Sequence, residues 1–237
     1  MALPPRWAED PLSEFIQNSF ENTLATFVRK KGAFKVLVTI DSVFRGIGEN
    51  LDNPHNILVP AFLHRSHSAF LASCRLAMSG QAVDTFPPLR SCLEYALYAL
   101  HIYDNPAFAE VWLRRHDDDE SIRETRRLFQ HRRVMESLRA RDVPLHDNLS
   151  ELYERTIDFG GHPNERAVSS SSVMRKEGDD AVIRNLFLHG DSLALDLALK
   201  TTAQVSLGSL MVFRLIFKER FHLLRLSDTI DALGNIL

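Results

Sequence analysis

Apolar residues recur along most of the chain at the spacing of an α-helix. The first series includes Phe15, Phe20 and Phe27 and ends in a basic cluster and Gly32, which is typical of a helix C-terminus. The same periodicity predicts further helices over residues 34–47, 57–78, 83–102, 117–141, 145–159, 192–224 and 227–233, with a short one from residue 105 through Trp112. We therefore expect an all-α array of about eight helices.

One segment departs from this periodicity. Residues 167–174 are rich in serine and valine, residues 176–180 have the composition of a turn, and residues 181–188 are apolar and β-branched. This order predicts a small β-hairpin near residues 167–188. A helix over residues 180–189 is the alternative.

The chain shows no internal repeat and no linker long enough to separate domains. We therefore expect a single helical domain over residues 1–237. Residues 1–11 contain three prolines and precede the first helical series, so they are expected to form an irregular arm.

Composition narrows the class of protein without indicating a partner. Of the 237 residues, 45% are hydrophobic, which excludes a disordered chain, and the formal net charge of −3 gives no general attraction to nucleic acid or to anionic membranes. The N-terminus has no secretory pattern, and the longest charge-free apolar stretch, residues 201–213, is too short to span a bilayer. Cys74 and Cys92 lie in apolar helical patterns, as expected for reduced thiols in a cytoplasmic protein.

Four polar residues form a stripe within the otherwise apolar helix over residues 83–102. Arg90, Glu94, Tyr98 and His101 follow one another at offsets of four, four and three, so they share one helix face. An ion pair between Arg90 and Glu94 is expected, mostly buried. Two interpretations remain open: a satisfied polar network in the core, or the wall of a ligand pocket between helices.

The preceding helix carries a polar pair of its own, His64 and His67. Consecutive helices commonly pack antiparallel, so this pair could face the Arg90 stripe. A metal site formed by these histidines with Glu94 or His162 is not favoured, because no matching Glu-x-x-His partner is present on another helix. We expect neither a metal nor an organic cofactor.

A weak family resemblance adds a loop to this candidate site. Arg90 precedes Glu94 by four residues, and the sequence Phe-Gly-Gly-His-Pro-Asn follows about seventy residues later, at residues 159–164. This combination resembles bacterial helical families of unknown function that are loosely HEPN-like, over about residues 60–220. The resemblance implies that His162 and Asn164 lie near the Arg90 stripe, and it brings no established activity. Gly161 stands where those families favour a valine or a similar residue.

HEPN ribonucleases, to which the resemblance extends loosely, place an arginine and a histidine on one helix so that both reach the same phosphodiester. The best match here is Arg184 with His189. This pair lies in the segment for which a strand is preferred, and the chemistry would require a helix.

The leading functional hypothesis is therefore a non-catalytic protein that binds a small molecule or a protein partner at the Arg90 stripe. The sequence contains neither a nucleophile elbow nor a phosphate-binding loop, and the runner-up is a HEPN-like ribonuclease or related defence factor. Nucleic-acid binding would depend on the arginine-rich face of residues 123–141. The simpler interpretation of that face is a solvated surface.

Self-association is expected from the stretch Val205–Phe217, which is apolar on nearly every side. A helix of this kind must be covered on all faces, either within the chain or by a second copy. The dimer interpretation requires an exposed patch, formed either by Leu210, Phe213 and Phe217 or by the neighbouring Phe221 and Leu224.

Overall fold

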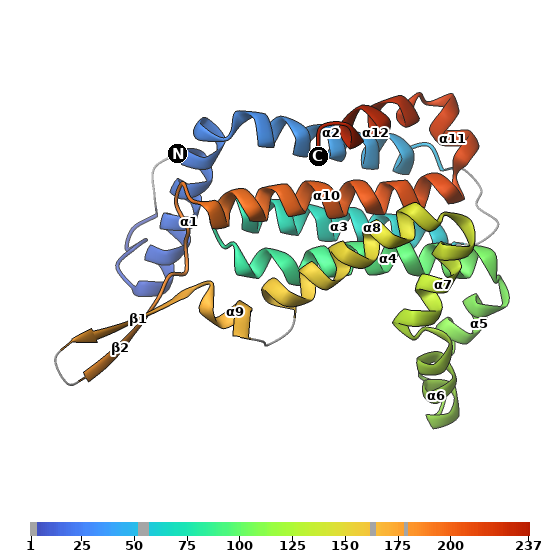
Figure 1. Ribbon diagram of the computed structural model, residues 1–237, viewed down its shortest axis with the longest axis horizontal. Helices are drawn as coiled ribbons and strands as arrows, with labels where there is room; N and C mark the ends of the chain where they lie inside the picture. The colour runs from blue at the N-terminus through green and yellow to red at the C-terminus, as the bar shows by residue number, and fades with distance from the viewer. Residues whose placement is uncertain (1–3, 52–56, 162–164, 178–179) are drawn as a thin grey trace.

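The computed structural model describes residues 4–51, 57–161, 165–177 and 180–237, and these ranges are almost entirely helical (Figure 1). The all-α class with a small hairpin is thereby confirmed. The helices are α1 (Pro11–Arg29), α2 (Lys31–Gly48), α3 (Leu58–Met78), α4 (Phe86–Asp104), α5 (Ala107–Leu113), α6 (Asp119–Leu128), α7 (His131–Arg141), α8 (Val143–Thr156), α9 (Glu165–Ser169), α10 (Leu193–Ile216), α11 (Lys218–Leu223) and α12 (Leu226–Gly234). None of the helices in these ranges is both long and apolar enough to cross a membrane.

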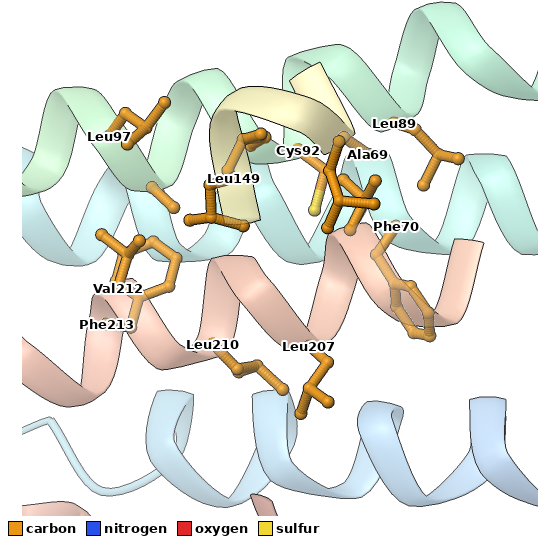
Figure 2. Close-up of a cluster of buried hydrophobic side chains, with 14 of the residues drawn as sticks. Ala69, Phe70, Leu89, Cys92, Leu97, Leu149, Leu207, Leu210, Val212 and Phe213 are labelled. Carbon is orange, nitrogen blue, oxygen red and sulfur yellow. The ribbon is translucent and has the colours of Figure 1, made fainter. Parts of the chain in front are cut away.

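Helix α10 forms the centre of the molecule. It contacts α2 on one side and α3, α4 and α8 on the other, and most of its residues are buried. Figure 2 shows Leu207 and Leu210 directed toward α2, whereas Val212 and Phe213 lie on the opposite side of the helix. The apolar stretch Val205–Phe217 is thus covered on all sides because helices of the same chain surround it.

This arrangement covers most of the segment on which the dimer expectation was based, although Leu223 remains 75% exposed. Leu210, Phe213 and Phe221 are fully buried within the chain, and Phe217 and Leu224 are half-buried. The segment therefore presents no broad apolar patch to a second copy.

Helices α3, α4 and α10 meet through small side chains that allow close packing. The hydroxyl of Ser66 donates to the Cys92 carbonyl oxygen at 2.8 Å, and Cys92 Sγ lies 3.6 Å from Ser209 Oγ. Burial raises the pKa of the Cys92 thiol, so the thiol stays protonated. Cys92 therefore behaves as a small, inert core side chain.

Helix α1 begins earlier than the apolar pattern suggests and is attached through polar contacts. The Asp10 carboxylate accepts the backbone N–H groups of Leu12 and Ser13, which satisfies two donors at the helix N-terminus. On its inner face, Asn22 donates from Nδ2 to the carbonyl oxygens of Ser79 at 2.8 Å and of His189 at 2.9 Å. One amide thus joins α1 to the end of α3 and to the segment that precedes α10.

That junction leaves no room for a side chain at Gly80. Gly80 has a φ of 84°, a region that favours glycine, and an added Cβ would lie 2.2 Å from the His189 carbonyl oxygen. The backbone N–H of His189 donates to the Gly80 carbonyl oxygen at 2.8 Å. The two backbones therefore approach closely because residue 80 has no side chain.

Two helices expected to be continuous are interrupted. Residues 117–141 form α6 and α7, because Gln130 has an extended backbone with ψ of 136°. The break exposes the last carbonyl groups of α6 to α4, where Tyr98 and His101 bond to them. Residues 192–224 likewise divide at Phe217 into α10 and α11, which lets the chain turn back so that α12 reaches α2.

The hairpin is shorter than the expected span of residues 167–188. Strands β1 (Ser172–Glu177) and β2 (Asp180–Asn185) pair antiparallel, with Ser172 opposite Asn185, and α9 occupies the start of the expected span. The two strands project from the helical body near the end where α1 lies (Figure 1). The alternative of a helix over residues 180–189 is wrong.

Candidate functional site

The predicted ion pair of α4 is formed. Arg90 Nε donates to Glu94 Oε1 at 2.9 Å, because residues four apart on a helix lie on the same side. The side chains are 29% and 36% exposed, so most of each is covered, as expected, but the pair is not fully enclosed. The pair lies at the surface of the helical body, where a ligand could reach it.

Tyr153 joins this pair from α8. Its hydroxyl donates to Glu94 Oε1 at 3.0 Å, and the Arg90 guanidinium lies over its ring, 5.2 Å from the centroid. The ring itself is buried because α8 packs its apolar face on the core through Leu149 and Leu152. Burial and the negative charge of Glu94 raise the pKa of Tyr153 to about 12. The phenol therefore keeps its proton at neutral pH and acts as a donor.

His131 also packs on the ring of Tyr153. It stands at the start of α7, and the two rings are stacked with centroids 3.8 Å apart and an interplanar angle of 14°. The contact excludes water from one face of the imidazole, and this desolvation lowers the pKa of His131. His131 is therefore uncharged at neutral pH.

We refer to Arg90, Glu94, Tyr153 and His131 as the Arg90 cluster. It combines a fixed cation, a carboxylate, a phenol and a neutral imidazole from three helices. Sequence reasoning missed Tyr153 and His131. A signal for Tyr153 was present, since it follows Leu149 by four residues on the apolar face of its helix and bears a polar group that requires a partner.

The other two residues of the predicted stripe serve a different purpose. The Tyr98 hydroxyl donates to the Phe129 carbonyl oxygen at 3.3 Å, and His101 Nε2 lies 3.2 Å from the Leu128 carbonyl oxygen. Because a carbonyl only accepts, His101 carries its proton on Nε2, and Nδ1 accepts from the Ser137 hydroxyl at 2.8 Å. Tyr98 and His101 thus hold the end of α6 in place.

His64 and His67 do not meet the Arg90 stripe. His67 Nε2 bonds to Asp41 Oδ1 of α2 at 2.6 Å and stacks on Phe44, and His64 lies against Gly48 of α2. Burial alone would raise the pKa of Asp41, but hydrogen bonds from Arg45 and His67 outweigh it and keep that pKa below its ordinary value. Both histidines therefore belong to the contact between α2 and α3.

His162 and Asn164, assigned to the site from the family resemblance, lie outside the described residues. The residues just before them are placed. Phe159 packs on Phe86 with ring centroids 5.7 Å apart, and a Cβ at Gly160 would lie 2.3 Å from the Val83 carbonyl oxygen. The end of this π-helical turn (Ile157–Gly161) therefore packs against the start of α4, one helical turn before Arg90.

Arg184 and His189 are not presented by one helix. Arg184 is exposed on β2, whereas His189 is buried in the segment after the hairpin, beside Gly80. Burial lowers the pKa of His189. This placement differs from the one that the ribonuclease hypothesis requires of the pair.

The arginine-rich face of residues 123–141 is solvent-exposed. Arg132 pairs with Glu136 at 3.3 Å, and Arg127 lies 3.8 Å from Glu124. Arg141 bonds to Asp104 of α4. These contacts fit the solvated-surface interpretation, since acidic groups neighbour Arg127, Arg132 and Arg141.

Within the part of the chain that the structure describes, no three His, Cys, Asp or Glu side chains are grouped closely enough to hold a metal ion. Comparison of the chain with protein-family models, with curated proteins and with solved structures found no match. The functional argument therefore depends on the geometry of the Arg90 cluster.

Proposed function

We propose that the protein binds a small molecule or a segment of a protein partner at the Arg90 cluster, and that the ligand carries an anionic group. The observation behind this proposal is the partial exposure of a guanidinium that a carboxylate and an aromatic ring hold in one orientation. A guanidinium fixed in this way binds carboxylates and phosphates without losing further side-chain entropy. We also propose a reducing compartment, the cytoplasm, because Cys74 and Cys92 are both free thiols.

The chemistry of the neighbouring groups supports binding over catalysis. Tyr153 keeps its proton because its pKa lies at about 12, and it donates to Glu94. Glu94 also accepts from Arg90. These groups are suited to orient a ligand, since each is committed to a fixed hydrogen bond.

The test is a thermal-shift screen with inorganic phosphate, nucleoside monophosphates and dicarboxylates. We expect at least one of these anions to raise the Tm of the wild-type protein, and Arg90→Gln to abolish the shift. Arg132→Gln is the matched control, because Arg132 also pairs with a glutamate four residues later but stands 90% exposed on α7. Equal shifts in all three proteins would contradict the proposal.

Arg90→Gln must also fold normally for this comparison to hold. An exposed or half-exposed ion pair contributes about 0.2–1 kcal/mol, so the Tm of the unliganded variant should fall by a few degrees at most. The ribonuclease alternative is examined with a labelled RNA, the wild-type protein, Arg90→Gln and a further variant, His189→Gln. Cleavage that is lost in His189→Gln and retained in Arg90→Gln would favour the ribonuclease and contradict the binding function.

A further inference from the structure

Helix α1 carries most of its large apolar residues on a side that the rest of the chain covers only in part. Ile16, Phe20, Leu24 and Phe27 are between 40% and 59% exposed, and at 3.6 residues per turn they lie within an arc of about 80°. Leu12 and Val28 extend this face at its two ends and are more exposed still. We call these six residues the α1 face.

The inner side of α1, in contrast, is partly polar. Thr26 is buried there beside the half-buried Phe15, and Asn22 makes the two hydrogen bonds that attach the helix to Ser79 and His189. An amphipathic helix on a monomer normally has the opposite orientation. The apolar side of α1 is thus available to another molecule, and burying it would remove several large side chains from water.

We propose that the α1 face binds the α1 face of a second copy of this chain, with the two helices antiparallel about a two-fold axis. The spacing of the face supports a partner of the same sequence. An antiparallel two-fold axis centred at position 22 along the helix pairs Phe20 with Leu24 and Ile16 with Val28, and both pairs lie within the α1 face. Such self-complementarity is what an isologous interface requires.

The charges at the two ends of α1 select the antiparallel direction. Glu9 and Asp10 precede the helix, and Lys31 and Lys35 follow it, all of them exposed. An antiparallel pair brings the acidic end of each copy near the basic end of the other, whereas a parallel pair would bring like charges together. The acidic end also disfavours an anionic membrane surface as the occupant.

The surface beside the α1 face supplies a recess for side chains of the second copy. A hollow of about 760 Å³ lies between α1 and α3, where Trp7, Phe20 and Leu76 are among its lining residues. Phe187, exposed after the hairpin, packs edge-on against Phe15, which also lines the hollow, with ring centroids 6.4 Å apart. A ridge on one copy can therefore enter a groove on the other, as packed helices require.

Light scattering over a dilution series tests the proposal. The wild-type chain should show a mass near twice 27.0 kDa at micromolar concentration, and Phe20→Glu should show 27.0 kDa. The control is Leu223→Glu on α11, because Leu223 is 75% exposed yet lies outside the α1 face. A wild-type mass of 27.0 kDa throughout, or a dimer that survives Phe20→Glu, would overturn the proposal.

A charge reversal tests the direction of the two helices separately. Lys31→Glu should raise the dimer Kd about tenfold, because both symmetry-related contacts become repulsive. Adding Glu9→Lys should restore most of the wild-type affinity, since the acidic and basic ends are then exchanged. A double variant that dimerises more weakly than Lys31→Glu alone would exclude the antiparallel arrangement. A chain that remains monomeric and binds phosphatidylcholine vesicles through Phe20 would exclude the dimer itself.

Discussion

Helices α10 and α1 are both rich in large apolar residues, but they lie in opposite surroundings. From Thr201 onward, helix α10 is apolar on nearly every side and is covered by α2, α3, α4 and α8. Helix α1 has a single apolar face, and that face is turned outward while Asn22 and Thr26 face the body. The apolar pattern of a helix therefore indicates that its apolar side needs cover. Whether that cover comes from the same chain or from another molecule is decided by how the helices pack in the folded structure.

The comparison also separates two ways of attaching a helix. The contacts of α10 are mainly apolar and spread over its whole length. We therefore expect α10 to detach only when the whole chain unfolds. Attachment of α1 depends more on a few directed hydrogen bonds, those of Asn22 above all. The three predictions below test this difference.

The largest effect is expected from removing one aromatic ring from each helix. Phe213→Ala should lower the free energy of unfolding by about 3–5 kcal/mol, because the ring is fully buried and leaves a cavity. Phe20→Ala should change it by less than about 0.5 kcal/mol when measured by urea denaturation at a protein concentration where the chain is monomeric. Comparable losses in the two variants would mean that the outward α1 face is covered within the chain.

A smaller effect is expected from the amide that attaches α1. Asn22→Ala removes both donors to the Ser79 and His189 carbonyl oxygens and should cost about 1–3 kcal/mol. Hydrogen exchange should show the loss of protection first in α1, with α10 unchanged. Asn18→Ala is the control, because Asn18 is exposed on the same helix. If protection falls equally in α1 and α10, the two helices form one cooperative unit.

The smallest effect concerns pH. Burial lowers the pKa of His189, whose carbonyl oxygen accepts from Asn22, so the unfolded chain takes up this proton at a higher pH than the folded chain. The contribution of neutral His189 to the free energy of unfolding is complete above the ordinary histidine pKa near 6.5. This contribution is lost as the pH falls from there through the lower pKa that His189 has in the folded chain. Protection of α1 should therefore decrease between pH 7.5 and pH 5.

Substitution of His189 separates its effect on the pH dependence of α1 protection from the effects of the other histidines. His189→Gln should flatten the pH dependence of α1 protection, whereas His222→Gln, an exposed substitution on α11, should leave it unchanged. His101 and His131 also have lowered pKa values, so the global stability retains some acid sensitivity in both variants. An α1 response identical in wild type and His189→Gln would assign the acid sensitivity to those other histidines.

The helical fold could be predicted from sequence because its signals are local. Apolar spacing predicted the helices and the serine- and valine-rich segment predicted a hairpin, and both are confirmed. The break at Gln130 could not be predicted, because it is stabilised by Tyr98 and His101 from a helix about thirty residues earlier. Periodicity along one segment contains no information about such partners.

The candidate site shows the same limit. Arg90 and Glu94 were predicted to pair because a separation of four residues on a helix decides the contact. Tyr153 and His131 come from other helices, and their approach depends on how α7 and α8 pack on α4. His64 and His67 were assigned to the wrong neighbour for the same reason, since the face of α3 that carries them packs on α2.

The enclosed Cys92 gives the protein an internal reporter of its own opening. Its sulfur lies between α3, α4 and α10, near Ser209, and no part of the residue is exposed. A thiol reagent can reach it only when these three helices separate, so the labelling rate of Cys92 in a Cys74→Ser background measures how often the core opens. Exposure of the core can thus be followed at a native residue, without introducing a new cysteine.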